Sequence, residues 1–283
     1  IPSRWFSGGI GLKEFRSNML KDKRIKQIVD FPKSRECFPG VDIAGGVNYF
    51  LWERDFSGSC NFISVIDGKS ETYQRNLDDF DILVRSNIGV KIINKIKSLS
   101  EKYMNHSVFS LAPFGINTSL RGSLSAFENS VGLISSSGLS FITLSEVNKN
   151  QDLIKDYKVI IGQLNPDRAG VNNSKDGKIN VTTKVRILDP NVVSSATYVL
   201  VSHFSSKSQA INCANYCRTK FVRFLISLTL SSMHISKDNF RFVPSLDFSK
   251  TYTDEMLYKM FSLDSNEINH IESVIRSMDF SYE

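Results

Sequence analysis

The sequence predicts a mixed α/β protein with more than one domain. Apolar runs of strand length alternate with segments whose apolar residues recur every three or four positions, which is the period of an amphipathic helix. The chain has 283 residues, of which 41% are hydrophobic. This length is comfortable for two domains, and this composition is enough for a sizeable core.

Residues 1–66 alternate helix and strand. The apolar side chains of residues 12–20 predict a helix of about ten residues. Strands are predicted over 25–31 and 47–55, and the continuous apolar core of the second indicates burial on both faces. Proline and glycine punctuate the connection between these strands, where a rigid turn would present the ring of Phe38. On pattern alone, Phe38 is more typical of a core or staple aromatic.

The density of charge rises over residues 67–85, and we place a domain boundary there. The aspartates of this region are typical of a solvated connection. Further on, the polar loop 165–177 has lysines and arginines around it, a composition shared by surface loops and by loops that contact DNA. The elements predicted in this part are a helix over 88–104, short strands within 109–144, and strands over 157–164, 178–188 and 196–201.

The stretch from Ser205 to Leu230 predicts one helix of about six turns with a single apolar stripe. Its polar face consists of Gln209, Asn212, Tyr216, Lys220 and Arg223, with Arg218 at the margin. Such a face offers cations and amide groups to a partner, but on pattern alone it is more typical of a solvated helix. Helix-start signals at Thr253 and Ser265 predict two short amphipathic helices near the end of the chain.

Charge and cysteine content limit the partners and the compartment. The formal net charge of +6 permits a polyanionic partner without requiring one. The four cysteines form no CxxC pair, and we expect them to be small core residues in the reducing cytoplasm. No apolar run of membrane-spanning length and no leader occurs, so we expect no membrane partner. Because the chain begins at Ile1 instead of Met, we also expect it to be part of a longer protein.

Motifs for common catalytic and metal sites are missing from the sequence. The GGxG of residues 8–11 lacks the GxGxxG spacing of a dinucleotide site. No GxxxxGK[ST], HExxH or GxSxG occurs, and none of the four histidines has a second His or Cys at ligand spacing. We therefore expect no catalytic residue and no metal site in this chain.

Several blocks of the sequence together resemble one family. The first two are IPSRWFSGGIGLKEFRSNMLKDKRIKQIVDFP and CFPGVDIAGGVNYFLWERD, and the later two are TKFVRFLISL and FVPSLDFSKTYTDEMLYKMFSL. In this order and spacing they resemble the part that follows the Asn-Pro-Pro-Tyr motif in bacterial adenine-specific DNA methyltransferases of restriction–modification systems. The resemblance covers nearly the whole chain.

The resemblance implies a domain layout and a cofactor for the parent enzyme. Residues 1–66 would be the last strands of a Rossmann-like catalytic domain, 67–245 a DNA target-recognition domain, and 246–283 a C-terminal helical segment. In the family a Gly-rich loop binds S-adenosylmethionine and Asn-Pro-Pro-Tyr binds the adenine amino group. Neither motif occurs here. We therefore expect no cofactor in this chain alone, and a catalytic N-terminal region of the same protein as its partner.

The resemblance also implies which residues meet double-stranded DNA. An aromatic between the last two strands packs on the flipped adenine in the family, and Phe38 occupies the matching position. The sequence itself offers basic and amide side chains for phosphates and base edges. Our candidates for these contacts are Arg121, Lys158, Arg168, Asn172, Asn173, Lys184, Lys220 and Arg223.

Two other functional classes remain compatible with the sequence. A restriction nuclease would need a PD…(D/E)xK-like constellation, and Pro166-Asp167 has no convincing ExK partner after it. A protein-interaction subunit of a restriction–modification complex would use an exposed stripe on the final helices. Salt-dependent DNA binding separates the leading hypothesis from the interaction subunit. Metal-dependent cleavage identifies the nuclease.

Overall fold

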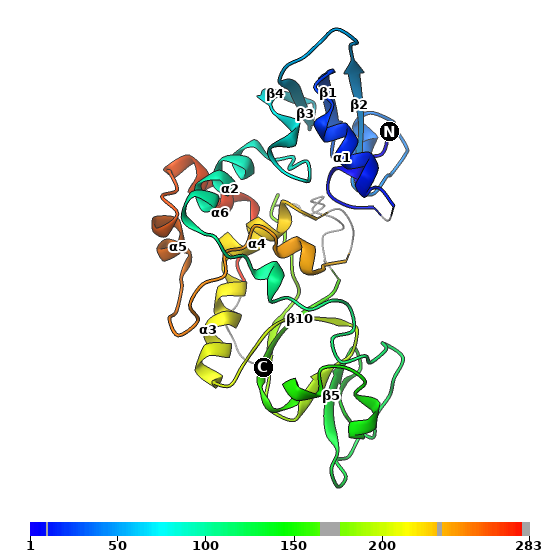
Figure 1. The fold of residues 1–283 in the computed structure, drawn as a ribbon, viewed down its shortest axis with the longest axis vertical. Helices are drawn as coiled ribbons and strands as arrows, with labels where there is room; N and C mark the ends of the chain where they lie inside the picture. Colours follow the sequence, from blue (N-terminus) through cyan, green and yellow to red (C-terminus); the bar gives the residue numbers. More distant parts are fainter. Residues whose placement is uncertain (10, 165–175, 231–233, 279–283) are drawn as a thin grey trace. The chain divides into compact units, whose positions relative to one another are not determined.

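The computed structural model describes residues 1–283 except 10, 165–175, 231–233 and 279–283. The chain divides into two compact units. Unit 1 consists of Ile1–Lys91, Asp167–Ile179 and Ser227–Met233, and unit 2 of Ile92–Pro166, Asn180–Ile226 and His234–Glu283. Helices and strands are mixed throughout, as the sequence predicts (Figure 1).

Unit 1 is built on a four-stranded sheet with the order β2-β1-β3-β4. Its elements are α1 (Lys13–Lys21), β1 (Ile25–Phe31), β2 (Val47–Trp52), β3 (Cys60–Ile66) and β4 (Lys69–Arg75). β1 pairs antiparallel with β2 and parallel with β3, and β3 and β4 form an antiparallel hairpin. The predicted helix and both predicted strands of this region are present, but β3 and β4 were not predicted, and β4 lies in the stretch expected to be a solvated connection.

The core of unit 1 lies between this sheet and the first residues of the chain. It contains Trp5, Phe6, Leu20, Ile25, Ile28, Cys60, Phe62, Leu77 and Leu83. One charged group is buried beside it. The Asp30 carboxylate accepts a hydrogen bond of 2.8 Å from Ser3 Oγ and lies 2.9 Å from Nε of Arg85. This pair ties β1 to the segment that follows the sheet.

The prediction that β2 is buried on both faces is wrong. Its first two residues are buried, but Tyr49, Phe50, Leu51 and Trp52 are 38–54% exposed. Successive side chains of a strand point to opposite faces of the sheet, so both faces are uncovered along this part of β2. β2 is also an edge strand, since β1 is its one neighbour among the described strands.

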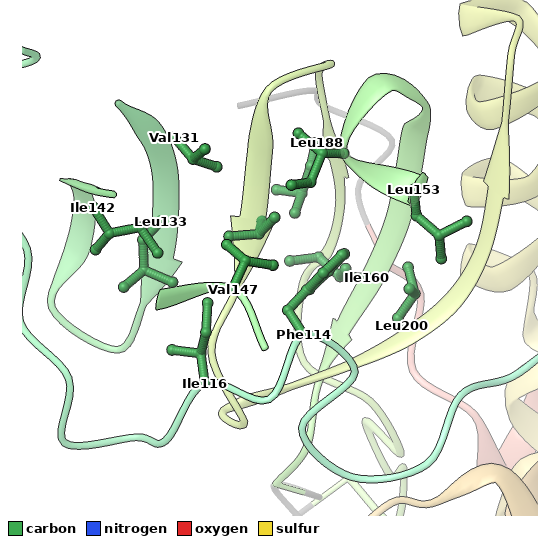
Figure 2. Packing of buried hydrophobic residues seen from close by; sticks show 12 residues of the cluster. Phe114, Ile116, Val131, Leu133, Ile142, Val147, Leu153, Ile160, Leu188 and Leu200 are labelled. Carbon is green, nitrogen blue, oxygen red and sulfur yellow. The ribbon is translucent and has the colours of Figure 1, made fainter. Parts of the chain in front are cut away.

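Unit 2 contains two three-stranded sheets, with the orders β6-β5-β9 and β10-β7-β8. The strands are β5 (Val131–Ser135), β6 (Gly138–Ile142), β7 (Tyr157–Gly162), β8 (Val185–Leu188), β9 (Val192–Ser194) and β10 (Tyr198–Phe204). Figure 2 shows side chains of both sheets meeting in one hydrophobic cluster, in which Leu133, Ile160 and Leu200 are fully buried. The two sheets therefore share a core.

Helices complete the described part of the fold. They are α2 (Asn87–Leu99), α3 (Lys207–Arg218), α4 (Lys220–Ser227), α5 (Asp254–Met260) and α6 (Ser265–Val274). α5 and α6 begin at the two predicted positions and are capped by the side chains of Thr253 and Asp264. In the part of the chain that the structure covers, no helix combines the length and the hydrophobicity needed to cross a membrane.

The long helix predicted over Ser205–Leu230 is two helices that are separated at Thr219. Thr219 is extended, with ψ of 149°, and its Oγ1 accepts a hydrogen bond of 3.2 Å from Val222 N. The carboxylate of Asp254 accepts from the backbone N–H groups of Lys220 and Phe221, at 3.0 and 2.8 Å. These bonds satisfy the first amides of α4, which a continuous helix would use internally.

Candidate nucleic-acid interface

Phe38 lies on an internally hydrogen-bonded turn between β1 and β2. Ser34 is buried, and its Oγ donates to Val41 O at 2.9 Å and accepts from Ile43 N at 2.8 Å. Phe38 N donates to Ser34 O at 2.8 Å, so the turn is held on both sides of the aromatic. The Phe38 side chain is 51% exposed. Its ring is therefore available to a partner and is not part of the core.

Lys158 is a core residue, and we correct the prediction that it contacts DNA. It lies in β7 with no exposed surface, and its Nζ donates to the carbonyls of Ile154 and Leu153 at 3.0 and 3.4 Å. Burial lowers the pKa of Lys158 to about 8, because removal from water disfavours the charged form. The ammonium group holds the preceding turn (Gln151–Lys155) in place instead of facing solvent.

Arg223 is buried as well, and the same correction applies. Its Nε donates to Arg218 O and Thr219 O at 3.0 and 3.3 Å, and its Nη1 to Asn180 O at 3.5 Å. Burial lowers the pKa of Arg223 to about 10. Tyr216, predicted on the same polar face, is also buried and donates its hydroxyl to Pro244 O at 2.9 Å. The face predicted to be exposed packs against the rest of unit 2.

Lys220 is partly buried and forms an ion pair within unit 2. Its Nζ contacts the Glu272 carboxylate, which also accepts a hydrogen bond of 2.8 Å from the Tyr258 hydroxyl. A DNA phosphate would have to compete with this carboxylate for the ammonium group. Lys220 is therefore a weaker candidate for a DNA contact than its position in the sequence indicates.

Arg121 and Lys184 are exposed, as a DNA contact requires. The guanidinium of Arg121 donates to Thr118 O and Leu120 O, at 2.8 and 3.0 Å, which fixes the side chain against its own loop. Lys184 immediately precedes β8. The remaining candidates, Arg168, Asn172 and Asn173, lie outside the described residues.

Sequence reasoning missed the backbone around Lys184. Val181 has a φ of 66°, a conformation that β-branched residues rarely adopt, and its side chain is fully buried. Nothing in the local sequence, which lacks glycine from 178 to 188, signals this conformation. The residues that bond to this segment are Arg218 and Arg223, and the helical pattern assigned them to a solvated face and its margin.

Potential metal ligands do not cluster in the described part of the chain. Among the described residues, no three His, Cys, Asp or Glu side chains come together as ligands for a metal ion. His203 Nδ1 and Asp156 Oδ2 lie 2.6 Å apart, at the paired ends of β10 and β7. No third ligand accompanies this pair in the described part of the chain.

The family model matches the N-terminal end of this chain. Residues 1–38 match the family model described as "Eco57I restriction-modification methylase". A protein of Mycoplasma pneumoniae (strain ATCC 29342 / M129 / Subtype 1) named "Uncharacterized adenine-specific methylase" is 30% identical over 119 residues. The alignment covers 38% of this chain and 28% of that relative, so the chain spans well under two thirds of the relative's length.

Among solved structures, the type IIG restriction endonuclease BpuSI aligns with 99% of this chain and 43% of its own, with a TM-score of 0.35 and 10% identity. A likeness at this TM-score carries no argument about the present chain. The relationship rests on the sequence matches. They show similarity to a restriction–modification methylase model over residues 1–38 and to an adenine-specific methylase over 119 residues.

Proposed function

We propose that this chain is the DNA-recognition portion of an adenine-N6 DNA methyltransferase from a restriction–modification system, and that Phe38 helps to hold the flipped adenine. The observation that carries the proposal is the half-exposed ring of Phe38 on a turn fixed by Ser34. This turn includes the last residues of the stretch that matches the methylase family model.

The chemistry of the reaction gives such a ring a role. The amino group of adenine is out of reach inside a duplex, so an enzyme that modifies it must extrude the base from the stack. An aromatic side chain that packs on the extruded base recovers about 1–3 kcal/mol of stacking. Because its turn is held in place before binding, Phe38 loses little conformational freedom when it stacks.

The methyl donor of the proposed enzyme is S-adenosylmethionine. In the proposed arrangement the donor and the Asn-Pro-Pro-Tyr motif belong to another region of the same protein, and this chain supplies the surface that positions DNA. The DNA contacts that we retain are Arg121, Lys184 and Lys220, together with Arg168, Asn172 and Asn173 outside the described residues. Lys158 and Arg223 are withdrawn because they are buried.

The edge strand β2 is the proposed contact with the methylase region, which is the part of the same protein that would hold the methyl donor and the Asn-Pro-Pro-Tyr motif. The four exposed apolar side chains of Tyr49–Trp52 alternate between the two faces of the sheet. Among the described strands none pairs with the outer edge of β2, which is bridged by Pro2 at Val47. A further strand would pair with this edge, and its neighbours would cover both faces. A sheet that continues beyond β2 is the Rossmann-like arrangement proposed for the parent enzyme.

DNA binding by this chain is tested by selection from a library of random duplexes at two salt concentrations. We expect a retained sequence whose affinity falls as salt rises, because phosphate contacts release counterions. Salt-sensitive retention without an enriched sequence would mean that specificity needs the methylase region. Absence of binding at low salt would overturn the proposed function and favour a protein-interaction subunit.

Replacement of Phe38 by alanine tests the role of its ring. In the full-length enzyme we expect Phe38→Ala to lower kcat/KM for methylation by about 5- to 150-fold, the equivalent of the stacking energy. Phe38→Tyr keeps an aromatic face and should retain most of the activity. Phe127→Ala, at a phenylalanine of similar exposure in unit 2, is the matched control. Equal activity of Phe38→Ala and this control would refute the role.

A further inference from the structure

The segment Asn180–Val185 presents one exposed lysine on a backbone that is otherwise buried or half-buried. Val181, Thr182 and Val185 are buried, and Lys184 is exposed. The segment also lies tightly against β7. A Cβ atom on Gly162 would be 2.0 Å from Thr183 Oγ1, so the absence of a side chain at Gly162 allows this close approach.

The backbone of this segment is strained. Val181 has a φ of 66°, in the left-handed region that β-branched residues rarely adopt. Thr182 N donates to Asn180 O at 2.7 Å across the bend. Such a conformation persists only where the surrounding structure enforces it, and enforced strain of this kind clusters at functional sites.

Two buried guanidinium groups, from α3 and α4, bond to the two ends of this segment. Arg223 Nη1 donates to Asn180 O at 3.5 Å, and Arg218 Nη2 donates to Val185 O at 2.8 Å. Both side chains are at most 3% exposed. Burying a charged group is unfavourable, and apolar residues of similar size often support a fold equally well. The hydrogen bonds of Arg223 and Arg218 to the Asn180 and Val185 carbonyls fix the backbone at both ends of the segment that carries Lys184.

We infer that Lys184 is an anchored phosphate contact, and that Arg218 and Arg223 are positioning residues that hold it in register on DNA. The inference rests on the proposed function, DNA binding by this chain. Phosphate contacts set the register of a protein on the duplex, and a lysine on a fixed backbone sets it more closely than one on a mobile loop.

The salt dependence of DNA binding tests the inference, because each phosphate contact contributes about one to the slope of log K against log salt. With a random duplex and the complete chain, we expect Lys184→Ala to reduce this slope by about one and Lys184→Arg to preserve it. Arg218→Lys keeps the charge but cannot reproduce the planar fork, so it should reduce the slope by a similar amount. The double variant Lys184→Ala with Arg218→Lys should fall no further than either single variant.

Controls separate positioning from general support of the fold. Lys158→Met removes another buried cation of unit 2 and should leave the slope unchanged, and circular dichroism shows whether each variant is folded. If Arg218→Lys does not fold, Arg223→Lys replaces it. The surface variant Lys184→Ala decides the phosphate contact in either case, and a wild-type slope for the folded arginine variant would overturn the positioning role. A wild-type slope for Lys184→Ala, with DNA binding intact, would overturn the inference alone, whereas no binding by the wild type would overturn the proposed function.

Discussion

At the scale of single residues, the cations of this chain are placed by contacts that lie outside their local sequence. Lys158 is in a strand of the pattern YKVIIG, where a lysine at the second position is commonly on a solvated face. Its burial depends on the carbonyls of Leu153 and Ile154, which the preceding turn directs at the ammonium group. The sequence pattern shows that Lys158 is charged, but it does not show where the carbonyls that accept from its ammonium group lie.

The lowered pKa of Lys158 predicts how its removal changes stability with pH. Between its folded pKa of about 8 and its ordinary value of 10.5, the unfolded chain holds the proton that the folded chain has released. The contribution of this group to the free energy of unfolding therefore rises with pH over that window, by about 1.4 kcal/mol for each pH unit. Urea unfolding from pH 7 to 10 should show wild type gaining about 2–3 kcal/mol relative to Lys158→Met. A constant difference across this range would contradict a buried, titrating lysine.

Phe38 is a residue for which the sequence pattern was compatible with two environments, and the structure selects the exposed one. The proline and glycine that follow it predict a turn, and the turn is present. What the pattern could not supply is Ser34, whose buried hydroxyl organises the turn from four residues before the ring. Whether the ring meets adenine stays a prediction.

At the scale of elements, the periodicity of residues 205–230 predicts helix correctly but misses its interruption. Thr219 is neither proline nor glycine, so no local signal ends α3. The first amides of α4 are capped by the Asp254 carboxylate, which lies 34 and 33 residues after Lys220 and Phe221 in the chain. A helix boundary imposed from elsewhere in the fold cannot be predicted from the helix sequence.

Asp254 is therefore expected to stabilise α4 from outside the helix. Asp254→Ala leaves two backbone amides without their acceptor, and loss of a helix cap costs about 0.5–2 kcal/mol. Asp254→Asn retains an acceptor oxygen and should cost less. Urea unfolding of the two variants checks the order. An equal loss in both would show that the charge of Asp254, which interacts electrostatically with Arg223, matters more than its hydrogen bonds.

At the scale of the whole molecule, the mixed α/β class and most elements of regular structure could be predicted, but not their pairing. β1 has β2 on one side and β3 on the other, one antiparallel and one parallel, and periodicity contains no information on such neighbours. The same limit explains the error in β2, since an apolar run predicts a strand but not what covers it. The domain boundaries placed near residues 66 and 245 stay predictions.

The proposed contact at β2 predicts a stability effect in the full-length protein. Leu51→Lys would place a charge where the methylase region is proposed to cover the sheet, and should lower the midpoint of thermal unfolding of the complete protein. Leu99→Lys, at a leucine of similar exposure outside this sheet, is the control. In the isolated chain, where both positions face water, the two variants should behave alike. Equal midpoints for the two variants in the full-length protein would rule out the contact.

The two tryptophans of the chain, Trp5 and Trp52, both belong to unit 1, and one is 2% exposed and the other 42%. Intrinsic fluorescence therefore follows unit 1, whereas unit 2 emits through its tyrosines. Emission from Trp5 should be blue-shifted and protected from iodide quenching. Emission from Trp52, at the end of β2, should be red-shifted and quenched. Trp52 is thus a natural optical reporter on β2, the strand that the methylase region is proposed to cover.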